Sequence, residues 1–119
     1  MIPYGKHHVD EEDIKSVIKV LKSDNLTQGP LNDAFEKEIS KYVGAKYSVA
    51  LTSCTAGLHL AAIVSKINKG KVLLTSPITF VATANSSLYC NGETIFADID
   101  SSTINISIDS IKKIISQKK

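Results

Sequence analysis

The chain contains no arginine, and all 14 of its basic residues are lysines. Arginine supplies the planar, two-point contacts that proteins favour for phosphates and guanine edges, so its absence argues against nucleic-acid binding. The formal net charge of +2 is also too small to make nucleic acid or anionic lipid the main partner. The sequence therefore predicts neither a nucleic-acid partner nor a membrane-surface role.

Cysteine, histidine and long apolar runs are scarce as well. The two cysteines, Cys54 and Cys90, stand far apart, and the three histidines show no metal-ligand spacing. The longest apolar run, residues 58–64, is interrupted by His59 and is far shorter than the ~20 residues that a membrane span requires. No signal peptide opens the chain. We therefore expect a protein of the reducing cytoplasm, without a metal site or a membrane span.

Apolar residues recur at helical spacing in two segments near the start of the chain. The first segment, residues 10–21, opens with four acidic side chains, which suit the positive end of a helix dipole. The second runs from Leu31 to Tyr42 and is closed by Gly44. The sequence predicts two helices joined by the loop at residues 23–30.

Strands and helices alternate in the remainder. We predict strands at 47–51, 72–75 and 94–97, and helices at 55–67, 79–91 and 106–115. This order indicates an α/β fold with right-handed crossovers and a mostly parallel sheet. The helix at 55–67 is apolar nearly all round, which predicts a place between the sheet and another layer. No strand follows the last helix, so we interpret the chain as an incomplete domain.

Small hydroxyl residues mark the first predicted turn from strand to helix. Thr52, Ser53 and Thr55 stand beside the first free amides of the helix, where amides and dipole together attract an anion such as phosphate. The alternative is that Ser53 or Thr55 is only an ordinary N-cap.

The second predicted turn, residues 76–80, carries a rigid Pro77 and an aromatic Phe80. A phenylalanine in this place can stack on a planar cofactor ring, and the alternative is a core side chain. Both turns follow parallel strands, and ligands of open α/β sheets gather at the carboxyl ends of such strands. Together the turns indicate one cofactor site.

Three stretches of the sequence are familiar, namely residues 2–5 (IPYG), 26–30 (LTQGP) and 75–85 (TSPITFVATAN). The whole chain resembles the N-terminal third of the vitamin B6-dependent sugar aminotransferases of the DegT/StrS group. These three stretches look most like the pseudaminic acid branch of that group. The resemblance implies the N-terminal part of the large domain of an aspartate-aminotransferase-like fold (fold type I). Residues 1–30 would form an N-terminal helix and substrate-side loop, and residues 31–119 a partial cofactor-binding domain.

The resemblance also implies roles for individual residues. Thr55 and Ala56 match the pair that binds the phosphate of pyridoxal 5′-phosphate (PLP), and Phe80 matches the aromatic residue that stacks on its ring. Cys54 stands where relatives carry a small residue, and loop packing is the alternative role for the substrate-side positions. The residues implied to border the nucleotide-sugar pocket are Tyr4, Asp24, Asn25, Leu26, Thr27 and Cys54.

The implied activity is transfer of the amino group of glutamate to the 4-keto carbon of a UDP-2-acetamido-2,6-dideoxy-hexos-4-ulose, in surface-glycan synthesis, by a homodimer. The family's Schiff-base lysine and its carboxylate partner lie beyond this sequence, so no catalytic residue is expected here and the chain alone should be inactive. Four lysines are expected at the opposite edge of the sheet, and two aspartates in a structural turn. These are Lys46, Lys66, Lys69, Lys71, Asp98 and Asp100.

Two other interpretations stay open. A different nucleotide-sugar aminotransferase, or a B6-dependent sugar dehydratase of the same group, would differ in residues outside this sequence. A non-catalytic binding or assembly module is the alternative from another class.

Overall fold

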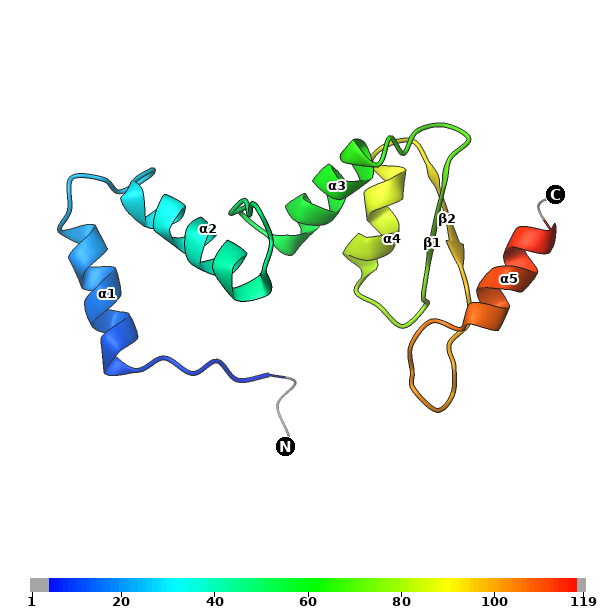
Figure 1. Ribbon diagram of the computed structural model, residues 1–119, viewed down its shortest axis with the longest axis horizontal. Helices are drawn as coiled ribbons and strands as arrows, with labels where there is room; N and C mark the ends of the chain where they lie inside the picture. The colour runs from blue at the N-terminus through cyan, green and yellow to red at the C-terminus, as the bar shows by residue number, and fades with distance from the viewer. Residues whose placement is uncertain (1–4, 118–119) are drawn as a thin grey trace. The chain divides into compact units, whose positions relative to one another are not determined.

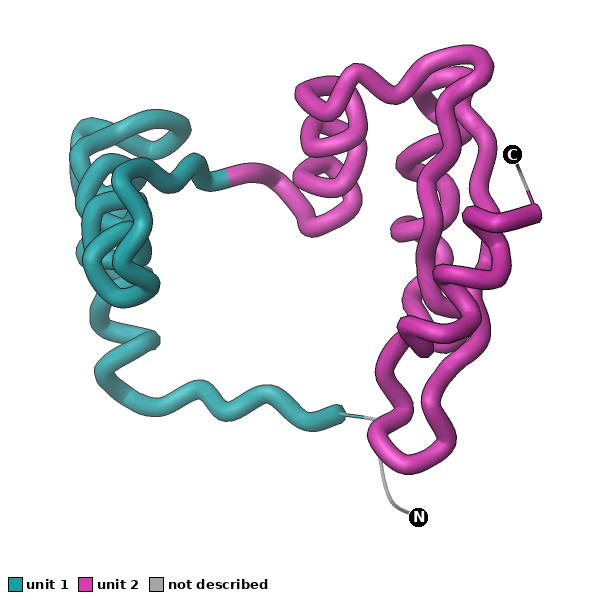
Figure 2. The backbone as a smooth tube through the Cα atoms, turned by 45° about the vertical axis from the view of Figure 1, so that its right-hand side comes forward, with its two compact units in different colours: residues 1–50 teal, residues 51–119 magenta. Residues whose placement is uncertain are grey.

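The structure, a computed structural model, describes residues 5–117 (Figure 1). It divides into two compact units, unit 1 up to Ala50 and unit 2 from Leu51 onward (Figure 2). The predicted division after residue 30 concerns binding roles and stays a prediction. Within residues 5–117, no helix has the length and apolar character needed to cross a membrane.

Unit 1 contains the helices α1 (Glu11–Leu21) and α2 (Pro30–Val43). The carboxylate of Asp10 accepts hydrogen bonds from the amides of Glu12 and Asp13, at 2.9 and 3.0 Å, and the Asp13 carboxylate accepts one from the Asp10 amide at 3.1 Å. This reciprocal capping explains why α1 starts here. Proline opens α2, and Gly44 ends it by taking a left-handed φ of 70°. Both predicted helices are confirmed.

The strand predicted at residues 47–51 does not form. The Ser48 hydroxyl donates a hydrogen bond to the backbone carbonyl of Glu36, and the Ala50 amide donates one to the Glu36 carboxylate at 2.8 Å. A strand needs a neighbouring strand for its backbone groups, whereas here the Ala50 amide and the Ser48 side chain bond to α2. The prediction was wrong because a local pattern says nothing about the partner.

Unit 2 contains α3 (Cys54–Val64), β1 (Val72–Thr75), α4 (Val81–Leu88), β2 (Glu93–Phe96) and α5 (Ile108–Gln117). The two strands pair in parallel, from Val72 opposite Glu93 to Thr75 opposite Phe96. The crossover helix α4 packs on both strands, and α3 packs on α4 (Figure 1). This arrangement confirms the predicted α/β class and the parallel pairing.

Three helices of unit 2 have other bounds than predicted. Helix α3 ends before Lys66, and α4 before Asn91, because each of these residues takes a left-handed φ of 58° and turns the chain toward the next strand. Helix α5 starts after Ser107, whose hydroxyl accepts a hydrogen bond from the Ser110 amide at 3.3 Å. Ile106 pairs with Ile99 in an isolated antiparallel bridge instead of starting the helix.

Small side chains make up the core of unit 2. Ser87 is fully buried, and its hydroxyl donates a hydrogen bond to the Glu93 carbonyl at 2.7 Å. Large apolar side chains of α3 stay exposed, including Ile63 at 50% and Val64 at 81%. The second layer predicted over α3 is therefore absent from the described residues. The buried residues of the described chain are Ala62, Ala82, Ser86, Ser87, Gly92 and Ala97.

Candidate functional site

The first turn of α3 carries the predicted phosphate-binding residues. Ser53 is the N-cap, and its hydroxyl accepts a hydrogen bond from the Ala56 amide at 3.2 Å. Among the described residues, the amides of Cys54 and Thr55 have no acceptor. The N-cap interpretation of Ser53 is thus confirmed, and two unpaired donors remain beside it.

Charge at the helix starts favours an anion at α3 and α4. The first turns of the other three helices contain acidic side chains, for example Asp33 in α2 and Asp109 in α5. The first turns of α3 and α4 contain none. Because no carboxylate offsets the positive end of these two dipoles, both stay available to an external negative charge.

Phe80 occupies the N-cap position of α4 without a capping hydrogen bond from its side chain. Its side chain is 73% exposed among the described residues, so it is not a core side chain of this unit. The preceding loop is held by hydrogen bonds from the Ile78 amide to the Ser76 hydroxyl, at 3.2 Å, and between the hydroxyls of Thr79 and Thr83, at 3.0 Å. An ordered loop thus presents an uncovered aromatic ring.

Only one of the two turns follows a strand of the sheet. The loop after β1 leads into α4, whereas the segment before α3 forms no strand. The prediction that both turns follow neighbouring parallel strands is therefore wrong for the first turn. Helices α3 and α4 nevertheless pack together and run in roughly the same direction, so their first turns lie toward the same end of unit 2 (Figure 1). Thr55, Ala56 and Phe80 therefore share one end of this unit.

The predicted substrate-side residues belong to other parts of the chain. Residues 24–27 lie exposed in the loop between α1 and α2 in unit 1, and residues 25–32 together with Val20 surround a hollow of about 70 Å³. Cys54 lies in unit 2, and Tyr4 lies outside the described residues. The roles of these residues in substrate binding stay predictions.

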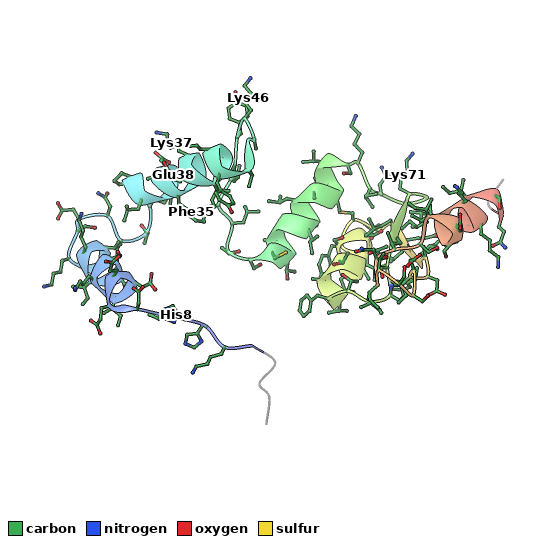
Figure 3. All side chains as sticks on the ribbon, turned by 60° about the horizontal axis from the view of Figure 1, so that its bottom comes forward. His8, Phe35, Lys37, Glu38, Lys46 and Lys71 are labelled. Carbon is green, nitrogen blue, oxygen red and sulfur yellow. The ribbon has the colours of Figure 1, made fainter. Side chains whose placement is uncertain are left out.

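The lysines stand at turns and strand starts. Lys71 directly precedes β1, at the end opposite to the loop that leads into α4 (Figure 3). Lys66 and Lys69 belong to the same connection between α3 and β1, and the amine of Lys46 lies 5.1 Å from the centre of the Tyr47 ring in unit 1. No group of metal-ligating side chains occurs within residues 5–117.

Asp100 organises a tight loop after β2. Its carboxylate accepts hydrogen bonds from the hydroxyl and amide of Ser102 and from the amide and hydroxyl of Thr103. The Ser102 hydroxyl, followed by these amides, lowers the pKa of the Asp100 carboxyl below its usual value. Such bonds agree with the structural role expected for this aspartate.

Glu36 is a residue that the sequence did not single out. It joins α2 to the segment that leads toward α3, through the hydrogen bonds from Ser48 and Ala50. A single glutamate on a polar helix face carries no sequence signal for such a contact.

The donors at this end of unit 2 fit the chemistry of PLP. The amides of Cys54 and Thr55, with the Thr55 hydroxyl, suit a phosphate group, and the exposed ring of Phe80 suits a planar pyridine. The Ala56 amide already donates a hydrogen bond to the Ser53 hydroxyl. The backbone donors that remain for a phosphate are therefore the amides of Cys54 and Thr55.

Residues 7–119 match the DegT/DnrJ/EryC1/StrS aminotransferase family. Over 99 residues, the chain is 41% identical to UDP-4-amino-4,6-dideoxy-N-acetyl-beta-L-altrosamine transaminase of Campylobacter jejuni, covering 83% of this chain and 26% of that protein. The chain spans between 26% and 30% of the length of five curated relatives that it matches.

Two solved structures show the same fold. Helicobacter pylori PseC, an aminotransferase involved in the biosynthesis of pseudoaminic acid, matches 94% of this chain with a TM-score of 0.85 and 33% identity, over 30% of its own length. The PLP-form of Spr1654 from Streptococcus pneumoniae matches 94% with a TM-score of 0.88 and 25% identity, over 29% of its length. The α/β arrangement is thus the N-terminal part of the PLP fold type I large domain. The chain belongs to the DegT/DnrJ/EryC1/StrS aminotransferase family.

Proposed function

We propose that this chain is the cofactor-anchoring part of a PLP-dependent nucleotide-sugar aminotransferase. The full-length enzyme moves the amino group of glutamate to the 4-keto carbon of a UDP-2-acetamido-2,6-dideoxy-hexos-4-ulose, in the synthesis of pseudaminic acid for surface glycans. The observation that carries the proposal is the family match over residues 7–119, combined with unpaired amide donors at the first turn of α3.

The phosphate is bound at the start of α3. Thr55 contributes its amide and its hydroxyl, and Cys54 contributes its amide. The Ala56 amide donates to the Ser53 hydroxyl at 3.2 Å and would have to leave this bond to become a further donor. Hydrogen bonds from amides to an ionised phosphate are about twice as strong as neutral ones, and the positive helix end adds to them.

Phe80 holds the cofactor ring flat. Its side chain stands exposed at the start of α4, and the bonded loop at residues 76–79 restrains the backbone that carries it. Stacking buries this apolar surface, which is otherwise in water. When bound, PLP supplies an electron sink and carries the amino group. The lysine that bonds to it covalently comes from outside this chain.

The substrate side is formed by residues 24–27, Cys54 and Tyr4. In the full-length enzyme these residues border the UDP-sugar, and the active site lies at the interface of a homodimer. The polar loop between α1 and α2 offers amide and hydroxyl groups suited to sugar hydroxyls. This chain contains no arginine, so the groups that it can itself offer to the UDP diphosphate are lysines and backbone amides.

The test uses a full-length version of the protein, incubated with PLP, glutamate and the UDP-linked 4-keto sugar. Mass spectrometry should show the keto sugar converted to an amino sugar, with formation of 2-oxoglutarate. Loss of water from the sugar without gain of nitrogen would indicate the dehydratase. A monodisperse full-length protein that binds no PLP and converts no keto sugar would refute the proposal.

A further inference from the structure

Thr83 lies on α4, three residues after Phe80, and holds the chain on both sides of the Phe80 side chain. Its hydroxyl is hydrogen-bonded to the hydroxyl of Thr79, the loop residue directly before Phe80, at 3.0 Å. Its backbone amide donates a hydrogen bond to the carbonyl of Phe80 itself, also at 3.0 Å. The residue that carries the exposed ring is therefore restrained at both ends by one threonine.

Thr83 is itself anchored within unit 2. It is half-buried, and its carbonyl accepts a hydrogen bond from the hydroxyl of the buried Ser86 at 2.8 Å. The carbonyl of the next residue, Ala84, accepts one from the Thr94 hydroxyl on β2, also at 2.8 Å. The second of these bonds ties this part of α4 to the sheet. Thr83 is thus a fixed point that restrains the loop before Phe80.

The surroundings of the Thr83 side chain are mainly apolar. It lines a hollow of about 150 Å³ together with residues of α3, β1 and α4, among them Leu58, Ala61 and Leu73. A hydroxyl group beside apolar side chains is costly unless it is hydrogen-bonded. Among the described residues, the partner of this hydroxyl is the Thr79 hydroxyl. The bond to Thr79 is therefore the contact that offsets this cost.

We infer that Thr83 is a positioning residue for the ring of Phe80. The hydrogen bond between the hydroxyls of Thr79 and Thr83 fixes the backbone that carries the ring, and so sets the plane that the ring offers to the pyridine of PLP. This inference rests on the proposed function, in which Phe80 stacks on the cofactor. It adds a residue whose effect on the cofactor passes through Phe80.

The restraint matters because the ring has little else to hold it. The side chain of Phe80 is 73% exposed, so few neighbours restrict it, and its direction depends on the backbone. Stacked aromatic rings attract each other best in particular arrangements. A loop that is not held must be ordered when the cofactor binds, and the lost conformational freedom reduces the affinity. Removal of the hydroxyl bond should therefore weaken PLP binding even though Phe80 keeps its side chain.

The experiment compares variants of a full-length version of the protein. Thr83→Val removes the hydroxyl and keeps the branched shape, whereas Thr83→Ser keeps the hydroxyl. Thr94→Val is the matched control, because it removes the bond from Thr94 to α4 and leaves the bond between Thr79 and Thr83 in place. The dissociation constant for PLP is measured by titration, and the unfolding temperature is measured without PLP.

We expect Thr83→Val to weaken PLP binding about three- to tenfold, the scale of one lost neutral hydrogen bond. Thr83→Ser should keep most of the affinity, and Thr94→Val should lower the unfolding temperature while keeping wild-type affinity. Should Thr83→Val not fold, Thr79→Val removes the same bond from its other end and should cause the same loss of affinity.

A second set of variants tests whether Thr83 acts through Phe80. Phe80→Leu removes the aromatic ring, and Thr83→Val is then added to it. If Thr83 positions that ring, its replacement should not weaken PLP binding further once the ring is gone. A further loss as large as in the wild-type background would overturn the inference, because Thr83 would then act on the cofactor by another route.

Wild-type PLP affinity in both Thr83→Val and Thr79→Val would also overturn the inference, and would leave the proposed function intact. Equal weakening by Thr94→Val would do the same, because the effect would then be one of stability. A folded wild-type protein that does not bind PLP at all would refute the proposed function, and this inference with it.

Discussion

Gly92 stands where a side chain cannot be accommodated without movement of its neighbours. An added methyl group would lie 2.5 Å from Cγ2 of Ile67, 2.7 Å from the Ser87 hydroxyl and 3.2 Å from the Lys71 carbonyl. Ser87 is fully buried and its hydroxyl is bonded to the Glu93 carbonyl. The Gly92 amide also donates a hydrogen bond to the Ser87 carbonyl at 2.9 Å, which ties this glycine to the C-terminal end of α4.

We predict that Gly92→Ala lowers the free energy of unfolding by about 2–4 kcal/mol. Overpacking a well-filled core costs roughly 1–3 kcal/mol, and disturbance of the buried Ser87 hydrogen bond adds about 1 kcal/mol. The matched control is Gly57→Ala in α3, where the new methyl group meets only Leu51 Cδ1, at an ordinary 3.5 Å. Replacing a helical glycine by alanine stabilises by roughly 0.5–1 kcal/mol, so the control should have the opposite sign.

The assay is urea unfolding of the full-length version without PLP, followed by far-UV circular dichroism, with both variants and the wild type in one buffer. The midpoint should fall for Gly92→Ala and should hold or rise for Gly57→Ala, with similar slopes. If both variants moved the midpoint in the same direction by similar amounts, the packing argument would be refuted.

Three further predictions concern the site and the loop after β2. Thr55→Ala in a full-length version should weaken PLP binding by about 1–2 kcal/mol, the scale of one charge-assisted hydrogen bond, while Thr55→Ser should keep most of the affinity. Equilibrium dialysis measures the PLP affinity of both variants, and an unchanged affinity of Thr55→Ala would remove Thr55 from the site. The isolated chain of 119 residues should show no transaminase activity, and borohydride treatment with PLP should not label one specific lysine, as peptide mass spectrometry would reveal. Hydrogen bonds from Ser102 and Thr103 lower the pKa of Asp100 from 3.8, so their stabilising effect is complete above that value and is lost as the pH falls through the lower folded-state pKa. Asp100→Asn should remove this part of the acid dependence in unfolding curves measured on either side of pH 3.8, and a slope equal to that of the wild type would contradict the assignment.

The helix ends of unit 1 could be predicted because their signals are local. Asp10 and Asp13 bond each other's amides within one turn, and Gly44 alone supplies the left-handed conformation that ends α2. The strand at residues 72–75 was predicted to the residue, since a short apolar run after a Lys-Gly turn is also a local signal. None of these features depends on distant parts of the chain.

The failed predictions concern partners. Residues 47–51 alternate like a strand, but the Ser48 hydroxyl and the Ala50 amide bond with Glu36, a residue more than ten positions away. Ile63 and Val64 belong to a helix whose apolar surface predicted a covering layer, and both are exposed within the described residues. A pattern of side chains indicates which surface prefers burial, whereas the contact that buries it depends on the rest of the fold.

The sequence by itself determined the helix ends of unit 1, the parallel α/β class and the residue types suited to a phosphate and a planar ring, because these follow from local backbone chemistry and spacing. The tertiary structure alone decided that the Ala56 amide is engaged while its neighbours stay unpaired, and that the Phe80 ring is exposed. It also decided that Glu36 holds the segment before α3. Hydrogen-bond pairing and burial depend on which groups meet in space, and that is set only when the whole chain packs.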